Sequence, residues 1–163
     1  MPKKIMSWFL GLILILPIAL VTYGEGKAEV SVEPHLKKLR IYEREGRYEE
    51  AIIEGKMALE INPEDERVYS ALRSVYTLAG KYKDALKISE KLLEIVKSKG
   101  LPVCGYIQKH ALILEYAGRQ DEAIRFLEGY RESCPKSVGK IVNGLRKAKS
   151  KGERFFPFPP PGR

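Results

Sequence analysis

Residue types that carry chemistry are sparse in this sequence of 163 residues. It has two histidines and two cysteines, and these form no cluster with the spacing of zinc ligands. Motifs typical of phosphate-binding loops, dinucleotide sites, zinc proteases and serine hydrolases do not occur. No nucleophile lies at motif spacing from a general base. We therefore expect no catalytic residue, no metal and no cofactor, and we predict that the protein is not an enzyme.

The histidines and the paired carboxylates have structural explanations. His110 has the spacing of a core-facing residue, which predicts a buried histidine with satisfied ring nitrogens. His35 begins the first predicted helix, and we expect it to be solvated. The acidic pair Glu49–Glu50 opens a predicted helix, where the positive end of the helix dipole favours carboxylates.

The positive charge of the chain is concentrated at its C-terminal end. The net charge is +8, from 29 Lys and Arg against 21 Asp and Glu. Residues 25–135 carry 19 basic and 20 acidic side chains, whereas residues 136–163 carry 8 basic and 1 acidic. A nucleic-acid-binding domain is typically basic over a whole face. We therefore expect no nucleic-acid partner.

The first 24 residues have the pattern of an export segment. Lys3 and Lys4 precede an apolar run from Ile5 to Tyr23, and no acidic residue interrupts it. A basic start followed by an apolar stretch is typical of a cleaved signal peptide. The run is also long enough for a retained membrane anchor. Both interpretations place everything after Glu25 outside the cytoplasm, in the periplasm or secreted.

A short motif recurs along the middle of the chain. It has the form Gly-basic-x-x-acidic-Ala and begins at Gly46, again at Gly80 and more weakly at Gly118. Apolar residues at spacings of three and four precede and follow each glycine, which indicates a helix on either side of it. We predict that each glycine ends the first helix in a left-handed conformation.

This pattern resembles the tetratricopeptide repeat, a helix–turn–helix unit of about 34 residues. The matching residues are Tyr42 and Tyr76 four before the glycine, Tyr48 and Tyr82 two after it, Ala51, Ala85 and Ala123 five after it, and later Pro63 and Pro135. The resemblance implies an all-α solenoid of three hairpins over residues 32–135, at about 32–65, 66–103 and 104–135.

The resemblance has departures at two packing positions. The small residue that the family has seven before the glycine is present only as Ala111, whereas Leu39 and Arg73 stand there in the other units. The large apolar residue eight before the glycine is Leu72 in the second unit only. Lys38 and His110 occupy it elsewhere.

Two further segments complete the predicted stack. The second unit has four extra residues, which we place at the end of its second helix. Residues 137–150, with Val138, Ile141, Val142 and Leu145 on one stripe, predict a C-terminal capping helix over the last unit. The alternative for this segment is an amphipathic helix on a membrane surface.

The cysteines lie at the two ends of the third predicted hairpin. Cys104 begins its first helix and Cys134 ends its second. Because the helices of a hairpin are antiparallel, these ends meet at one edge. In an exported protein this predicts a disulfide. The alternative is two unrelated buried thiols.

The family resemblance also implies a binding surface. In tetratricopeptide repeats the first helices line a concave groove in which partner peptides lie. The implied groove residues are Leu36, Arg40, Arg44, Ser70, Ser74, Thr77, Gln108, Leu112 and Tyr116. The expected partner is another protein or peptide.

Residues 151–163 form a Phe- and Pro-rich tail that we expect to be disordered. Its candidate binding residues, with the end of the preceding helix, are Lys149, Lys151, Arg154, Phe155, Phe156 and Phe158. We predict a non-catalytic scaffold, in the cell envelope or secreted, that helps to assemble an envelope complex. The alternative is a peripheral membrane or polyanion tether that acts through this tail.

Overall fold

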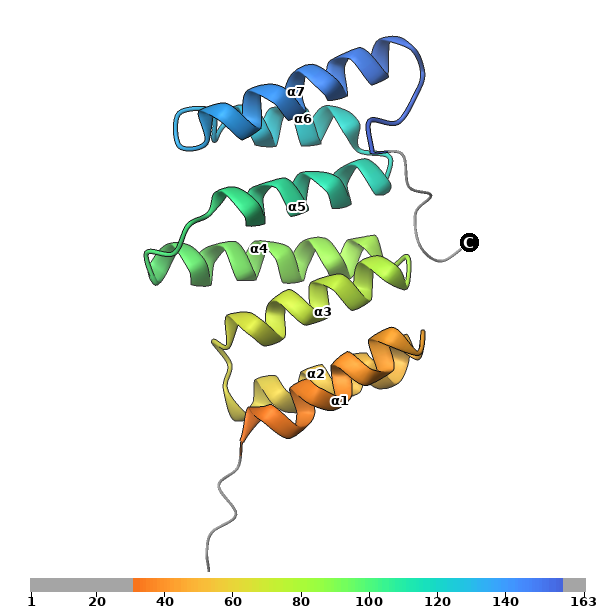
Figure 1. Ribbon diagram of the computed structural model, residues 1–163, viewed down its shortest axis with the longest axis vertical. Coiled ribbons are helices and arrows are strands. Elements are labelled where there is room, and N and C mark those ends of the chain that lie inside the picture. Colours follow the sequence, from red (N-terminus) through yellow and green to blue (C-terminus); the bar gives the residue numbers. More distant parts are fainter. Residues whose placement is uncertain (1–30, 157–163) are drawn as a thin grey trace, which may run out of the picture.

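The computed structural model describes residues 31–156, and seven α-helices follow one another in that range (Figure 1). They are α1 (Val32–Arg44), α2 (Tyr48–Ile61), α3 (Glu66–Leu78), α4 (Tyr82–Ser98), α5 (Cys104–Tyr116), α6 (Gln120–Glu128) and α7 (Pro135–Ser150). The described residues contain no strand. The predicted all-α fold class is confirmed.

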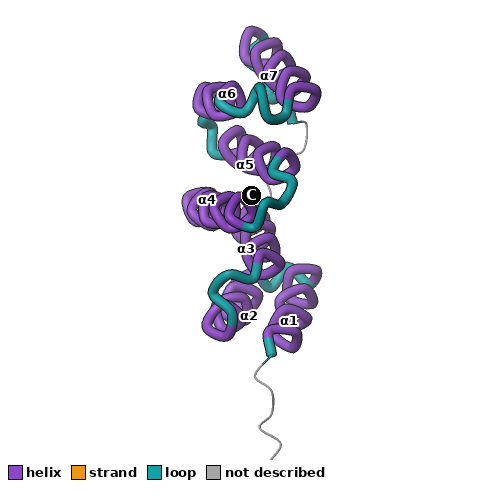
Figure 2. Tube along the Cα trace, turned by 90° about the vertical axis from the view of Figure 1, so that its left-hand side faces the viewer, coloured by secondary structure: helices purple, strands orange, loops and turns teal. Residues whose placement is uncertain are grey.

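The helices form a stack of antiparallel pairs. Each helix packs on the next one in the chain, and α1 also contacts α3. Seen from the side, α2, α4 and α6 lie along one edge of the stack, with α1, α5 and α7 along the other (Figure 2). α7 therefore takes the place of the first helix of a further hairpin. This is the helical solenoid that the repeated motif predicts.

The glycine of each motif ends a helix as expected. Gly46, Gly80 and Gly118 have φ angles of 73°, 70° and 76°, in the left-handed region that glycine adopts without strain. The amide after Gly80 donates to the carbonyl of Tyr76 at 2.9 Å, and the bonds after the other two glycines are equivalent. These bonds satisfy helix-end carbonyls and turn the chain into the second helix.

Small residues hold the paired helices close together. The alanine five residues after each glycine is fully buried. Gly55 of α2 faces Leu72 so closely that a Cβ atom would lie 2.4 Å from the leucine Cδ2. Ion pairs about one repeat apart add to this packing, as between Arg67 and Glu33 and between Lys99 and Glu66. The repeated sequence thus produces a repeated set of contacts.

The third hairpin differs from its expected form. α6 ends at Glu128, before Gly129, and therefore does not reach Cys134 as predicted. A turn follows, and α7 begins at Pro135, two residues earlier than expected. The extra residues of the second unit do lengthen its second helix, since α4 has 17 residues and α2 has 14.

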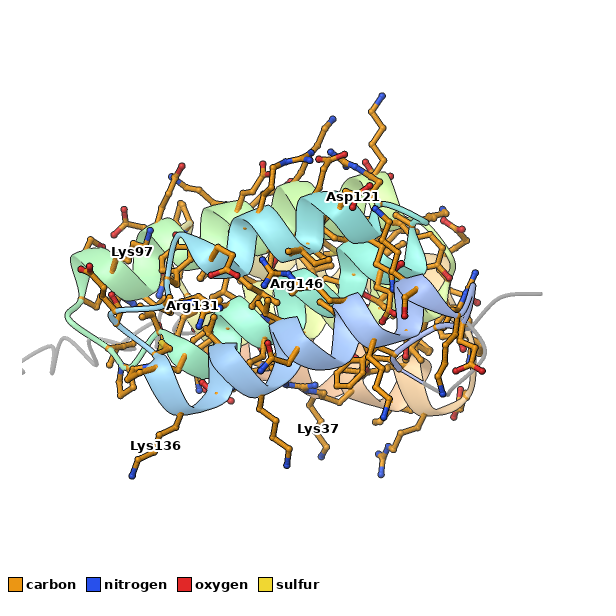
Figure 3. The ribbon with its side chains drawn as sticks, turned by 90° about the horizontal axis from the view of Figure 1, so that it is seen from above. Lys37, Lys97, Asp121, Arg131, Lys136 and Arg146 are labelled. Carbon is orange, nitrogen blue, oxygen red and sulfur yellow. A yellow bond between two sulfur atoms is a disulfide. The ribbon has the colours of Figure 1, made fainter. Side chains whose placement is uncertain are left out.

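The C-terminal part of the described residues packs on the stack over a greater length than expected. Val138, Val142 and Leu145 of α7 are fully buried, as the capping interpretation requires. Arg146 of α7 binds the carboxylate of Glu128 and links α7 to α6, and Arg131 of the intervening turn binds the same carboxylate (both arginines are labelled in Figure 3). Residues 151–156, which we expected to be disordered, have a defined place beside α5 and α7.

The predicted export segment, residues 1–24, lies outside the described residues, as does the tail from 157 onwards. Between residues 31 and 156, no helix combines the length and the apolar character that crossing a bilayer requires.

Candidate binding groove

A pocket of about 410 Å³ opens between the first helices of the three hairpins. It is lined by Arg40 of α1, by Ser70, Arg73, Ser74, Thr77 and Leu78 of α3, and by Lys109, Leu112, Ile113 and Tyr116 of α5. Three of these side chains are cationic and none is acidic. The apolar and cationic side chains together create a surface suited to a group that is both anionic and partly apolar.

Six of the nine groove residues implied by the resemblance line this pocket. They are Arg40, Ser70, Ser74, Thr77, Leu112 and Tyr116. The other three lie elsewhere. Leu36 packs against the core, and Arg44 is exposed with its Nε donating to the carbonyl of Arg40 at 3.3 Å. Gln108 is half-buried on α5 and does not line the pocket.

Sequence reasoning missed four lining residues, Arg73, Leu78, Lys109 and Ile113, and Arg73 is the most unusual of them. Only 4% of its surface is exposed. Its Nη2 donates to Ser70 Oγ at 3.2 Å, and its guanidinium lies 5.8 Å from the centre of the Tyr106 ring. Its Nη1 has no hydrogen-bond partner among the described residues. The sequence did contain a signal for Arg73: it stands seven residues before Gly80, where the family has a small residue.

The other two lining cations reinforce the positive charge of the pocket. Arg40 is exposed and binds Glu43 on its own helix at 3.3 Å. Partial burial, and then the charges of Arg73 and Arg40, lower the pKa of Lys109. An anion bound in the pocket would offset the effect of the Arg73 and Arg40 charges on the pKa of Lys109.

Hydroxyl groups line the same pocket. Thr77 Oγ1 donates to the carbonyl of Arg73 at 2.7 Å, so this donor is already used within α3. Burial, followed by the charges of Glu115 and Tyr82, raises the pKa of Tyr116. Its phenol therefore stays protonated and polar at the end of the pocket.

The two histidines lie outside the pocket. His110 is buried as predicted, with its ring centroid 4.3 Å from that of Phe126. Its Nδ1 has no partner among the described residues, so the expectation of satisfied ring nitrogens is wrong. His35 is only partly solvated: its side chain is 20% exposed, and its Nδ1 lies 2.7 Å from Glu54 Oε2 across the first hairpin.

Glu115 anchors the tail to the stack. This carboxylate is 3% exposed and accepts hydrogen bonds from the amides of Phe155 and Phe156, at 2.6 and 3.2 Å. The ring of Phe155 lies over Gly144 of α7, where a Cβ atom would come within 2.0 Å of its Cε2. The first two phenylalanines of the tail thus pack on this chain.

The basic tail candidates differ in their surroundings. Lys149 forms an ion pair with Asp121 of α6. Lys151 and Arg154 are exposed. Phe158 lies outside the described residues. Of the six tail candidates, three are therefore in contact with the stack through Glu115, Gly144 or Asp121.

Cys104 and Cys134 come together as expected. Their Sγ atoms are at disulfide-bonding distance and their Cα atoms are 5.7 Å apart. The position of Cys134 differs from the expected one, because it precedes α7 and does not end α6. The pair joins the start of α5 to the turn before the capping helix.

Comparison with known proteins supports the repeat. The family model of the tetratricopeptide repeat matches residues 68–103, which cover most of α3, all of α4 and the segment that leads to α5. A comparison with curated proteins finds no match. Repeats of this type generally mediate contacts between proteins, and their fold is typically a non-catalytic scaffold. The matched unit and the seven stacked helices of the described residues support a repeat protein of the tetratricopeptide type.

Proposed function

We propose that the protein is a non-catalytic scaffold that holds a segment of another protein in the groove between α1, α3 and α5. The observation that carries this proposal is the pocket of about 410 Å³ on the first helices of consecutive repeats. Its apolar side chains, Leu112 and Tyr116 among them, can bury a partner's side chains, and its polar ones can position the partner's backbone.

We further propose that this scaffold acts outside the cytoplasm, in the cell envelope or secreted, where it helps to assemble an envelope complex. The basic and apolar pattern of residues 1–24 and the paired cysteines support export, because disulfides persist in oxidising compartments. Alkylation of thiols in intact cells, before lysis, tests this point. Protected cysteines support export, and fully alkylated ones contradict it.

Site-specific photo-crosslinking in the native cells tests the scaffold function. A photoreactive residue at Ser74 lies in the groove, and one at Met57, which is 41% exposed on α2, provides the control on another helix. We expect the Ser74 probe to capture one discrete protein that the Met57 probe does not. The same products from both probes, or none from Ser74, would contradict the proposal.

A further inference from the structure

Arg73 stands at a packing position of the repeat. The same position, seven residues before the glycine, holds Leu39 in the first unit and Ala111 in the third, and both are fully buried. The repeat therefore folds with an apolar side chain here. The arginine in the second unit is not required by the architecture, so its presence needs another explanation.

The charge of Arg73 is poorly compensated within the chain. Residues 31–156 provide no ion pair to it, and its guanidinium contacts only the hydroxyl of Ser70 and, at a greater distance, the ring of Tyr106 within that range. A buried cation without a counter-ion is costly. Burial also lowers the pKa of Arg73, because removing water from around the guanidinium disfavours its charged form.

An occupant with a carboxylate would remove that cost. A guanidinium has five donors and matches a carboxylate in a two-bond geometry. Nη1 of Arg73 is buried and unpartnered beside the pocket, so a rotation of the guanidinium towards the pocket would let it donate to the occupant. Lys109 and Arg40 line the same pocket, and no acidic side chain does. On the same side of the stack, Lys37 of α1 and Lys136 of α7 point outwards (Figure 3), which favours the approach of an acidic partner.

The shape and remaining lining of the pocket favour a peptide over a free anion. Its residues come from three helices, and Leu78, Leu112, Ile113 and Tyr116 lie beside the cations. A small inorganic anion would leave these apolar side chains uncovered. A chain segment with an acidic residue next to an aliphatic or aromatic one would use both kinds of lining.

We propose that the groove binds an acidic segment of a partner protein, with an Asp or Glu carboxylate of that segment on the guanidinium of Arg73. This proposal rests on the proposed scaffold function and specifies the chemistry of its partner. Lys109 and Arg40 flank the bound carboxylate, and Leu112 and Tyr116 contact the neighbouring side chain.

The test uses the full chain and an array of ten-residue peptides. Each peptide has one central Asp or Glu flanked by Leu, Phe or Gly, and a matched peptide carries Asn or Gln at the centre. We expect the acidic peptides to bind about tenfold or more tightly than their amide counterparts, because a charged hydrogen-bonded pair is lost in the latter.

Two variants make the test specific. R73M should lose the preference for acidic peptides and keep or raise the thermal midpoint, since it replaces a buried unpaired charge by an apolar side chain. R125M removes an exposed charge from α6, away from the groove, and should behave as wild type. A preference that survives R73M, or that wild type lacks, would overturn the proposal.

Citrate and phosphate are titrated in parallel. Binding of either as tight as that of the best acidic peptide, and dependent on Arg73, would overturn the peptide proposal in favour of a free anion. The crosslink from Ser74 separates the two proposals. A discrete partner captured equally by wild type and by R73M leaves the scaffold function standing and refutes the role of Arg73.

Discussion

Replacing His110 by leucine should remove most of the pH dependence of stability between pH 7 and pH 5. Burial, and then the charges of Arg119 and Arg73, lower the pKa of His110 from 6.5 to about 4. The folded chain therefore binds this proton more weakly than the unfolded chain does. The stability that neutral His110 contributes is present above pH 6.5 and is lost as the pH falls towards 4.

The size of this effect follows from the two pKa values. Linkage gives a loss of about 2 kcal/mol between pH 7 and pH 5, and about 3 kcal/mol below pH 4. Carboxylates contribute in a lower range. The hydrogen bond from Arg67 lowers the pKa of Asp65, so that its contribution is lost only below its ordinary pKa of 3.8. The interval from pH 5 to pH 7 therefore reports mainly on His110, and the comparison with the leucine variant removes the smaller contribution of the glutamates.

Urea unfolding followed by circular dichroism measures the free energy of unfolding at both pH values, with the disulfide intact. Leucine is a suitable replacement because Leu72 occupies the equivalent position of the second unit. We expect His110→Leu to be at least as stable as wild type at pH 7, since Nδ1 of the histidine is unpartnered. Comparison of the two proteins cancels the contributions of all groups other than residue 110. Equal pH dependence in both would refute the reasoning.

Two further perturbations test the C-terminal part of the stack. Reducing the Cys104–Cys134 pair should lower the free energy of unfolding by about 4 kcal/mol, because the loop-entropy model assigns that amount to a closed loop of about 31 residues. Urea unfolding curves with and without reductant measure this difference. Coincident curves would contradict the prediction. Gly144→Ala should displace Phe155, because the added Cβ would lie 2.0 Å from its ring. Limited proteolysis should then release the tail faster than in Gly139→Ala, where the nearest atom is an arginine side chain at 4.0 Å, and equal rates would show that the tail is not held there.

The repeated parts of the fold could be predicted because their signals are local. A glycine with apolar helical spacing on both sides specifies a helix end within a few residues, and Gly46, Gly80 and Gly118 all behave in this way. Contacts between neighbouring units then follow from the repeat itself. The stripe of Val138, Val142 and Leu145 also faces the stack as its spacing indicates.

The parts that escaped prediction depend on contacts between distant residues. The tail was expected to be disordered because its own sequence cannot form a helix. Its place is set by Glu115, 40 residues before Phe155, and by the space that Gly144 leaves open. The length of α6 escaped for a similar reason, since the turn that replaces its last residues brings Cys134 to Cys104.

Two of the departures from the repeat pattern, Arg73 and His110, are both buried but have different physical outcomes. Leu39 and Ala111 stand at the position of Arg73 in the other units, and Leu72 stands at the position of His110 in the second unit. Arg73 and His110 each have one nitrogen without a partner among the described residues. His110 stacks on Phe126 within its own hairpin, so no external ligand is placed to satisfy it. Arg73 lines the pocket, where the carboxylate of a bound partner can accept hydrogen bonds from its guanidinium. R73M should therefore remove the preference for acidic peptides and keep or raise the thermal midpoint, whereas His110→Leu should change stability at low pH and keep that preference.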